Sequence, residues 1–205
     1  RVTACTLVAA RSLAVPEPRL ALIAALAVVL GWLVVGLAGL LRPQSIFVVS
    51  RLMFPLGALG SVVLAAAGLA ALAAPPAELV LPLGLPDLPV HLRLDSLSAF
   101  FLFLLGSASA GISVFAAGYF RAGEGTSPGL LCLQYHVFLA SMTLVLLADD
   151  AYAFMVSWEL MALASYFLVT TQHRIPEIRA AGFLYLLLAH VGAIAILLCF
   201  GVLQG

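Results

Sequence analysis

The chain has 205 residues, of which 64% are hydrophobic and 9% are charged, and its formal net charge is zero. A soluble domain carries about 25% charged residues, because it must cover itself with groups that water accepts. This composition excludes an ordinary soluble enzyme. Without an excess of positive charge, it also excludes a protein that binds nucleic acid. We therefore expect lipid to be the solvent for most of the chain.

Six stretches are apolar enough to cross a bilayer core about 30 Å thick, which needs roughly 20 residues of helix. They are residues 20–41, 52–74, 97–120, 130–148, 152–171 and 179–203. Arginine, proline or aspartate follows most of them, as Arg42-Pro43 and Asp149-Asp150 do. The sequence predicts an all-α, polytopic transmembrane helix bundle of about six helices, forming a single membrane domain over residues 1–205.

A proline-rich segment, residues 75–94, separates the second and third predicted helices. Five prolines within residues 75–89 exclude a helix there. The following residues 90–94, Val-His-Leu-Arg-Leu, alternate between apolar and polar side chains. This alternation is typical of a short strand or hairpin arm. We expect the segment to be an external loop.

The distribution of arginine predicts how the chain is oriented, because arginine-bearing loops stay on the cytoplasmic side. The segments after the first, third and fifth helices carry Arg42, Arg51, Arg121, Arg174 and Arg179. The segments after the second and fourth carry Arg93 with Glu78, Asp87, Asp95, Asp149 and Asp150. We expect the first set in the cytoplasm and both chain ends outside, although Arg1, Arg11 and Arg19 oppose this orientation.

A carboxylate lies inside the fifth predicted helix. Glu159 stands about seven residues, or roughly 10 Å, from the start of that helix. A charge at this depth costs several kcal/mol unless it is paired, hydrated or protonated. Burial also favours the protonated carboxyl. Proton or ion handling is therefore the leading hypothesis, and a structural hydrogen bond to a neighbouring Ser, Thr or His is the alternative.

Two histidines lie at membrane depth and are candidate relay partners of this glutamate. His190 is about eleven residues into the sixth predicted helix and His136 about six residues into the fourth. Imidazole both accepts and donates protons near neutral pH, which suits a relay. Taken alone, each histidine is as readily interpreted as a packed, hydrogen-bonded residue of the bundle interior. Asp149 and Asp150 are interpreted as loop charges that open the next helix.

The sequence offers no constellation for catalysis or for metal binding. Cys5, Cys132 and Cys199 are far apart and have no ligand spacing. No nucleophile is spaced with a base. We therefore expect no catalytic residue, no cofactor-binding residue and no metal site in this chain.

Residues 154–169, Phe-Met-Val-Ser-Trp-Glu-Leu-Met-Ala-Leu-Ala-Ser-Tyr-Phe-Leu-Val, resemble the fifth-helix signature of antiporter-like proton-pumping membrane subunits. That superfamily includes the large membrane subunits of respiratory complex I and the Mrp sodium/proton antiporters. Residues 94–98 and 140–150 resemble the start of its third helix and its fourth helix with an acidic end. Asp-Asp-Ala-Tyr at 149–152, the fifth-helix motif and His190 are most similar to the branch of hydrogenase-4 component B and formate hydrogenlyase subunit 3.

The resemblance implies a proton-translocating membrane subunit of a hydrogenase-4, formate hydrogenlyase or complex I-like (NADH dehydrogenase-related) redox complex. Glu159 would be the buried glutamate of the family, in a prokaryotic inner (cytoplasmic) membrane. The partners implied are other membrane and peripheral subunits, which hold the metal cofactors. Family members have about 14 helices and a lysine on the seventh, whereas this chain has six candidate helices and no Lys. We therefore expect it to be an N-terminal fragment.

Two other functions stay open from the sequence. The motifs are equally compatible with a sodium/proton antiporter subunit of the Mrp type. A membrane scaffold that transports nothing, with Glu159 held in a structural hydrogen bond, is the alternative of another class.

Overall fold

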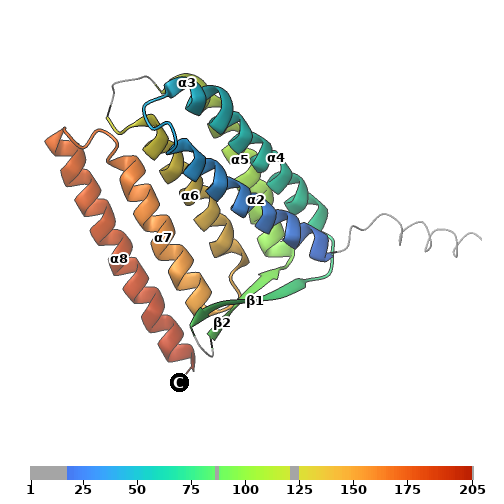
Figure 1. Ribbon diagram of the computed structural model, residues 1–205. Helices are drawn as coiled ribbons and strands as arrows, with labels where there is room; N and C mark the ends of the chain where they lie inside the picture. Colours follow the sequence, from blue (N-terminus) through green and yellow to red (C-terminus); the bar gives the residue numbers. More distant parts are fainter. Residues whose placement is uncertain (1–17, 86–87, 121–124, 205) are drawn as a thin grey trace, which may run out of the picture.

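The computed structural model describes residues 18–85, 88–120 and 125–204. Within these ranges six helices are long and apolar enough to span a membrane. Figure 1 shows them as a bundle with roughly aligned axes. The predicted transmembrane helix bundle is confirmed. Residues 1–17, with Cys5, Arg1 and Arg11, and also Asp87 and Arg121, lie outside the described part of the chain.

The helices begin and end within a few residues of the predicted bounds, with one exception. The spanning helices are α2 (Pro18–Gly39), α4 (Phe54–Ala71), α5 (Ser96–Tyr119), α6 (Pro128–Leu147), α7 (Ala151–Val169) and α8 (Pro176–Gln204). The second span begins at Ile46 rather than at residue 52, because a short α3 (Ile46–Val48) and a π-helical η1 (Val49–Met53) run directly into α4. Arg51 is exposed within η1, where a long cationic side chain can reach the membrane surface without ending the helix.

Aspartates cap two of the spanning helices. The Asp95 carboxylate accepts a hydrogen bond from the Ser98 N–H at 2.8 Å and thereby begins α5. Asp150 accepts one from the Ala153 N–H at 2.6 Å and begins α7. Side-chain oxygens at this position satisfy amides that have no partner within the helix. The interpretation of Asp150 as a charge that opens the next helix is therefore confirmed.

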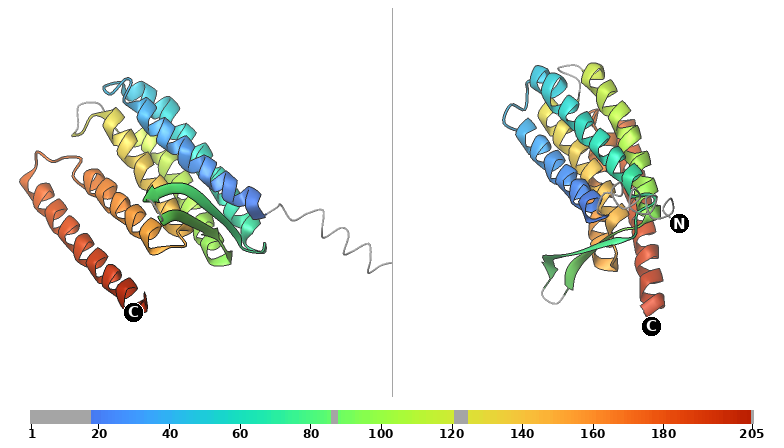
Figure 2. Two further views of the ribbon diagram at one scale, coloured as in Figure 1. Left: turned by 60° about the horizontal axis from the view of Figure 1, so that its bottom comes forward. Right: turned by 90° about the vertical axis from the view of Figure 1, so that its right-hand side faces the viewer.

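The proline-rich segment folds as an antiparallel hairpin of β1 (Ala77–Leu85) and β2 (Leu88–Leu94). The predicted strand at residues 90–94 lies in β2, but the part predicted as loop contains a strand as well. β1 tolerates Pro82 because the pairing register shifts between Leu81 and Gly84, and proline at a bulge needs no ladder N–H. Gly84 has φ 122, which favours glycine. In Figure 2 the hairpin crosses one end of the bundle.

Close backbone packing holds α4 against α5. A Cβ atom added at Gly106 would lie 2.6 Å from the Ser61 carbonyl oxygen, and one at Gly68 would lie 2.7 Å from the Ala99 carbonyl oxygen. Small residues allow such approaches between membrane helices. The small-residue face predicted on the third span is therefore a contact at Gly106, whereas Gly111 faces open space.

Hydrogen bonds between loops show which connections share an end of the bundle. The Thr126 N–H donates to the Thr171 carbonyl at 3.0 Å, and the Gly129 N–H donates to the Pro43 carbonyl at 2.9 Å. The connections after α2, α5 and α7 therefore meet at one end, which we call the arginine-rich end (Arg42, Arg51, Arg174 and Arg179 among the described residues). The hairpin lies at the other end (Figure 1). The grouping agrees with the predicted orientation, whose cytoplasmic side stays a prediction.

Candidate functional site

Glu159 lies near the middle of α7, on the side that faces α8. It is eight residues beyond the first residue of α7, Ala151, which places it about 12 Å along the helix axis. Its side chain is 40% exposed within the described structure, so the expectation of a buried carboxylate is too strong for this chain. The reason is that α8 stands at the edge of the bundle and covers only part of α7 (Figure 1).

His190 of α8 is the ionisable partner that packing brings to this carboxylate. Its Nε2 atom lies 3.4 Å from Glu159 Oε2, within ion-pair distance. The two helices run antiparallel, so the middle of one meets the middle of the other. The proximity of His190 and Glu159 in depth is therefore realised as a direct contact between the two side chains.

A backbone carbonyl decides what this contact can do chemically. His190 Nδ1 lies 2.9 Å from the Leu186 carbonyl oxygen, which can only accept a hydrogen bond, so Nδ1 carries the hydrogen. Nε2 of a neutral ring is then an acceptor. An acceptor facing a carboxylate at this distance is favourable only with a proton between the two atoms. The pair is thus suited to hold one proton, as carboxyl with imidazole or as carboxylate with imidazolium.

A second polar contact joins α7 to α8 nearer the arginine-rich end. The hydroxyls of Ser165 and Tyr185 are hydrogen-bonded to each other, and Ser165 also donates to the Ala162 carbonyl at 3.0 Å. Ser165 belongs to the fifth-helix motif, but Tyr185 carries no signal in the sequence that would assign it to a site. Only the packing of α8 on α7 places the two hydroxyls together.

His136, the other histidine predicted as a possible relay, lies in a different part of the bundle. Its side chain is fully buried and stacks with Phe54 of α4 at a ring-centroid distance of 6.2 Å. Its Nδ1 lies 2.8 Å from the Cys132 carbonyl, and its Nε2 has no hydrogen-bond partner in the described part of the chain. A Cβ atom added at Gly57 would lie 2.6 Å from that Nε2. The structure therefore places His136 against α4, whereas the Glu159–His190 pair joins α7 to α8.

The remaining predicted interface residues tie the hairpin to the end of α7. The His91 N–H donates to Asp150 Oδ2 at 2.7 Å, and the His91 ring Nδ1 lies 3.6 Å from the same oxygen. Asp149 N–H donates to the His91 carbonyl at 2.9 Å. Across the hairpin, Arg93 and Glu78 form an exposed ion pair at 3.9 Å. No group of three or more His, Cys, Asp or Glu side chains with metal-site geometry occurs among the described residues.

Known proteins share part of this sequence. No family model matches the chain. Over 114 residues, 55% of this chain and 17% of the relative, it is 39% identical to an uncharacterized protein of Mycobacterium tuberculosis strain H37Rv. Over 109 residues, 53% of this chain and 16% of the relative, it is 36% identical to hydrogenase-4 component B of Escherichia coli strain K12. Less than a fifth of the length of these curated relatives is therefore matched.

A solved membrane complex shares the fold. One chain of the membrane-bound sulfane sulfur reductase, an archaeal respiratory membrane complex, matches with a TM-score of 0.66 and 22% identity. The match covers 85% of this chain and 26% of that chain. Most of the helix arrangement described above is thus found in a membrane subunit of known structure.

Proposed function

This chain belongs to the antiporter-like membrane subunits, and we propose that it serves as the proton-translocating part of a membrane-bound redox complex. The similarity to a hydrogenase-4 component and the fold shared with a respiratory complex support a membrane subunit of such an assembly. Its partners would be other membrane and peripheral subunits of a hydrogenase-like or complex I-like assembly in a prokaryotic inner membrane. Electron transfer would take place in those partners.

The observation that carries the proposal is the contact between His190 Nε2 and Glu159 Oε2 at 3.4 Å, in the middle of two membrane helices. Ionisable side chains at this depth are expensive in lipid and are kept chiefly for ion paths or for pairing. Here the tautomer set by the Leu186 carbonyl leaves one position between the two atoms for a proton. A site that holds one proton in two alternative forms can pass it on when a neighbouring charge changes.

The residues of the pair have different roles in this proposal. Glu159 is the primary proton-binding group, and His190 stabilises the carboxylate when it is ionised by taking the proton on Nε2. Ser165 and Tyr185 join the same two helices nearer the arginine-rich end and keep α8 aligned with α7. His136 lies against α4 and has a packing role in this scheme.

The test uses the assembled complex in inverted membrane vesicles, with proton uptake followed by a pH-sensitive dye and electron transfer measured in parallel. We expect Glu159→Gln to lower proton uptake at least tenfold while electron transfer continues, because the amide cannot be protonated and deprotonated. Glu177→Gln is the matched control, since Glu177 is an exposed carboxylate in the first turn of α8. Normal pumping by the Glu159→Gln complex would refute the proposal.

The same vesicles distinguish the other two functions. A proton flux that stops when sodium is withdrawn would assign sodium/proton antiport instead. A complex in which neither Glu159→Gln nor His190→Gln alters any flux, but in which both loosen the packing of α8, would assign a scaffold with a structural pair. In the proposed function the flux is independent of sodium and depends on both side chains.

A further inference from the structure

A cavity of about 700 Å³ opens between α6 and α7 at the arginine-rich end, and none of the roles described above uses it. Its mouth is formed by Thr126, Ser127, His173 and Arg179, which lie at the ends of the helices. From there it extends inward to Val137 on α6 and Leu160 on α7. Each of these lies nine residues from its helix end, or about 14 Å into the bundle.

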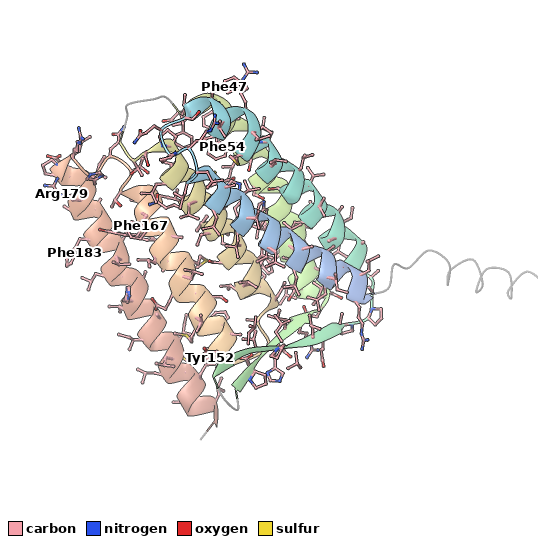
Figure 3. All side chains as sticks on the ribbon, in the orientation of Figure 1. Phe47, Phe54, Tyr152, Phe167, Arg179 and Phe183 are labelled. Carbon is pink, nitrogen blue, oxygen red and sulfur yellow. The ribbon has the colours of Figure 1, made fainter. Side chains whose placement is uncertain are left out.

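The wall of the cavity changes character along this length. The inner part is lined by aliphatic and aromatic side chains, among them Leu130, Leu133, Leu163 and Phe167. The mouth presents hydroxyl groups, an imidazole and a guanidinium. Figure 3 shows Phe167 on α7 and Arg179 at the adjacent end of α8. This gradient from apolar depth to polar, cationic mouth follows the membrane normal, as does the gradient within a phospholipid molecule.

The charge at the mouth favours an anionic headgroup. Arg179 is exposed, and its Nη1 atom donates to the carbonyl oxygens of His173 at 2.8 Å and Arg174 at 3.2 Å. These bonds fix the side chain over the mouth and leave the other nitrogens of the guanidinium for a ligand. Among the described residues no carboxylate lines the cavity. Basic pockets at helix ends are typical sites for anionic lipid headgroups.

An amide in the wall provides a second, independent observation. Gln134 lines the cavity, and its Oε1 atom is buried without a hydrogen-bond partner in the described part of the chain. Buried polar atoms in native proteins are nearly always paired, and an unpaired one calls for a ligand or a water molecule. Gln134 lies six residues inside α6, about 9 Å from its start, in the region between headgroup and acyl chain.

We propose that this cavity is a binding site for an anionic glycerophospholipid, whose phosphate lies against Arg179 and whose acyl chain fills the apolar groove between α6 and α7. The cavity has the size of an ordinary small-ligand pocket, about 300–1,000 Å³. A zwitterionic lipid would place a second, positive group near the guanidinium and gain less from it.

The experiment measures lipid retained by the purified full chain, using native mass spectrometry after exchange with phosphatidylglycerol or phosphatidylcholine. We expect phosphatidylglycerol to be retained about tenfold more strongly than phosphatidylcholine, because a charge-assisted hydrogen bond is involved. Arg179→Gln should abolish this preference. Arg51→Gln is the control, since it removes an exposed arginine at the same end but outside the cavity.

A second variant tests the groove without altering the charge. Leu163 lines the cavity and is 44% exposed, so Leu163→Trp should be tolerated by the fold and should fill the groove. We expect it to lower retention of both lipids at least fivefold, whereas Val114→Trp, on an exposed face of α5, leaves retention unchanged. Helical content measured by circular dichroism verifies that each variant is folded.

Three results would overturn the assignment. The first is equal retention of the two lipids by the wild-type chain. The second is an equal effect of Arg179→Gln and Arg51→Gln. The third comes from a photoreactive residue placed at Leu133 in the complete protein: crosslinking to another protein segment rather than to lipid would show that protein fills the groove.

Discussion

Breaking the contact between Glu159 and His190 should reveal a coupling free energy that an exposed ion pair cannot supply. Opposite charges separated by 3.4 Å attract each other by about 5 kcal/mol at an effective dielectric constant near 20. Removing each charge from water subtracts several kcal/mol, and both side chains are only partly covered by protein. We therefore expect Glu159→Gln and His190→Gln to be coupled by about 2 kcal/mol.

The assay is a double-mutant cycle on the free energy of unfolding, measured for the chain in mixed micelles of mild and denaturing detergent. The chain contains its own control pair, Glu78 and Arg93, which lie 3.9 Å apart on the hairpin with 66% and 42% of their side chains exposed. Exposed pairs of this kind contribute about 0.2–1 kcal/mol. Glu78→Gln and Arg93→Gln should therefore be coupled by less than half as much.

The reasoning would be refuted by a coupling between Glu159 and His190 no larger than that of the hairpin pair. The same conclusion would follow if His190→Gln alone left the infrared carboxyl band of Glu159 unchanged. The proton shared by the two side chains is part of the mechanism, and removing the imidazole must alter how the carboxyl holds it.

Two further predictions concern the scaffold around the site. The hydrogen bond from the Ser98 N–H lowers the pKa of the Asp95 carboxyl, so Asp95 adds stability above the ordinary aspartate pKa and loses it as pH falls through the lowered value. Asp95→Ala should cost about 1 kcal/mol at neutral pH, and unfolding titrations at decreasing pH should show the difference from wild type vanish. Gly57→Ala would place a methyl group 2.6 Å from His136 Nε2 and should cost about 1–3 kcal/mol. Gly111→Ala, which meets nothing within 4 Å, should be neutral or slightly stabilising in the same unfolding assay, and equal costs at the two glycines would contradict this packing.

Hydropathy and end signals were sufficient to predict the spans. A bilayer requires long apolar helices whose backbone groups are all satisfied internally, so length and composition reveal them with little help from packing. Asp95 and Asp150 show the same locality, since a cap depends only on the next few residues. The start at Ile46 was missed because Arg51 was taken as a helix boundary, and a flexible cationic side chain does not impose one.

The hairpin was only half predicted, for a physical reason that applies to many sheets. Alternation marked residues 90–94, but β1 contains prolines that a local rule assigns to a loop. Whether proline is tolerated depends on the partner strand, and here the register shift at Leu81 removes the need for its N–H. Pairing between strands is a tertiary property, which local composition does not contain.

Periodicity gives the depth of a side chain in the membrane, but it gives neither the neighbouring helix nor the rotation of that helix. His136 and His190 were therefore equivalent candidates from the sequence, and Glu159 could be recognised only as an expensive carboxylate at membrane depth. The packing of α8 on α7 selects His190, pairs Ser165 with Tyr185 and turns His136 toward α4. These choices depend on the shapes of whole helix surfaces that meet in space, and no local pattern in the chain records them.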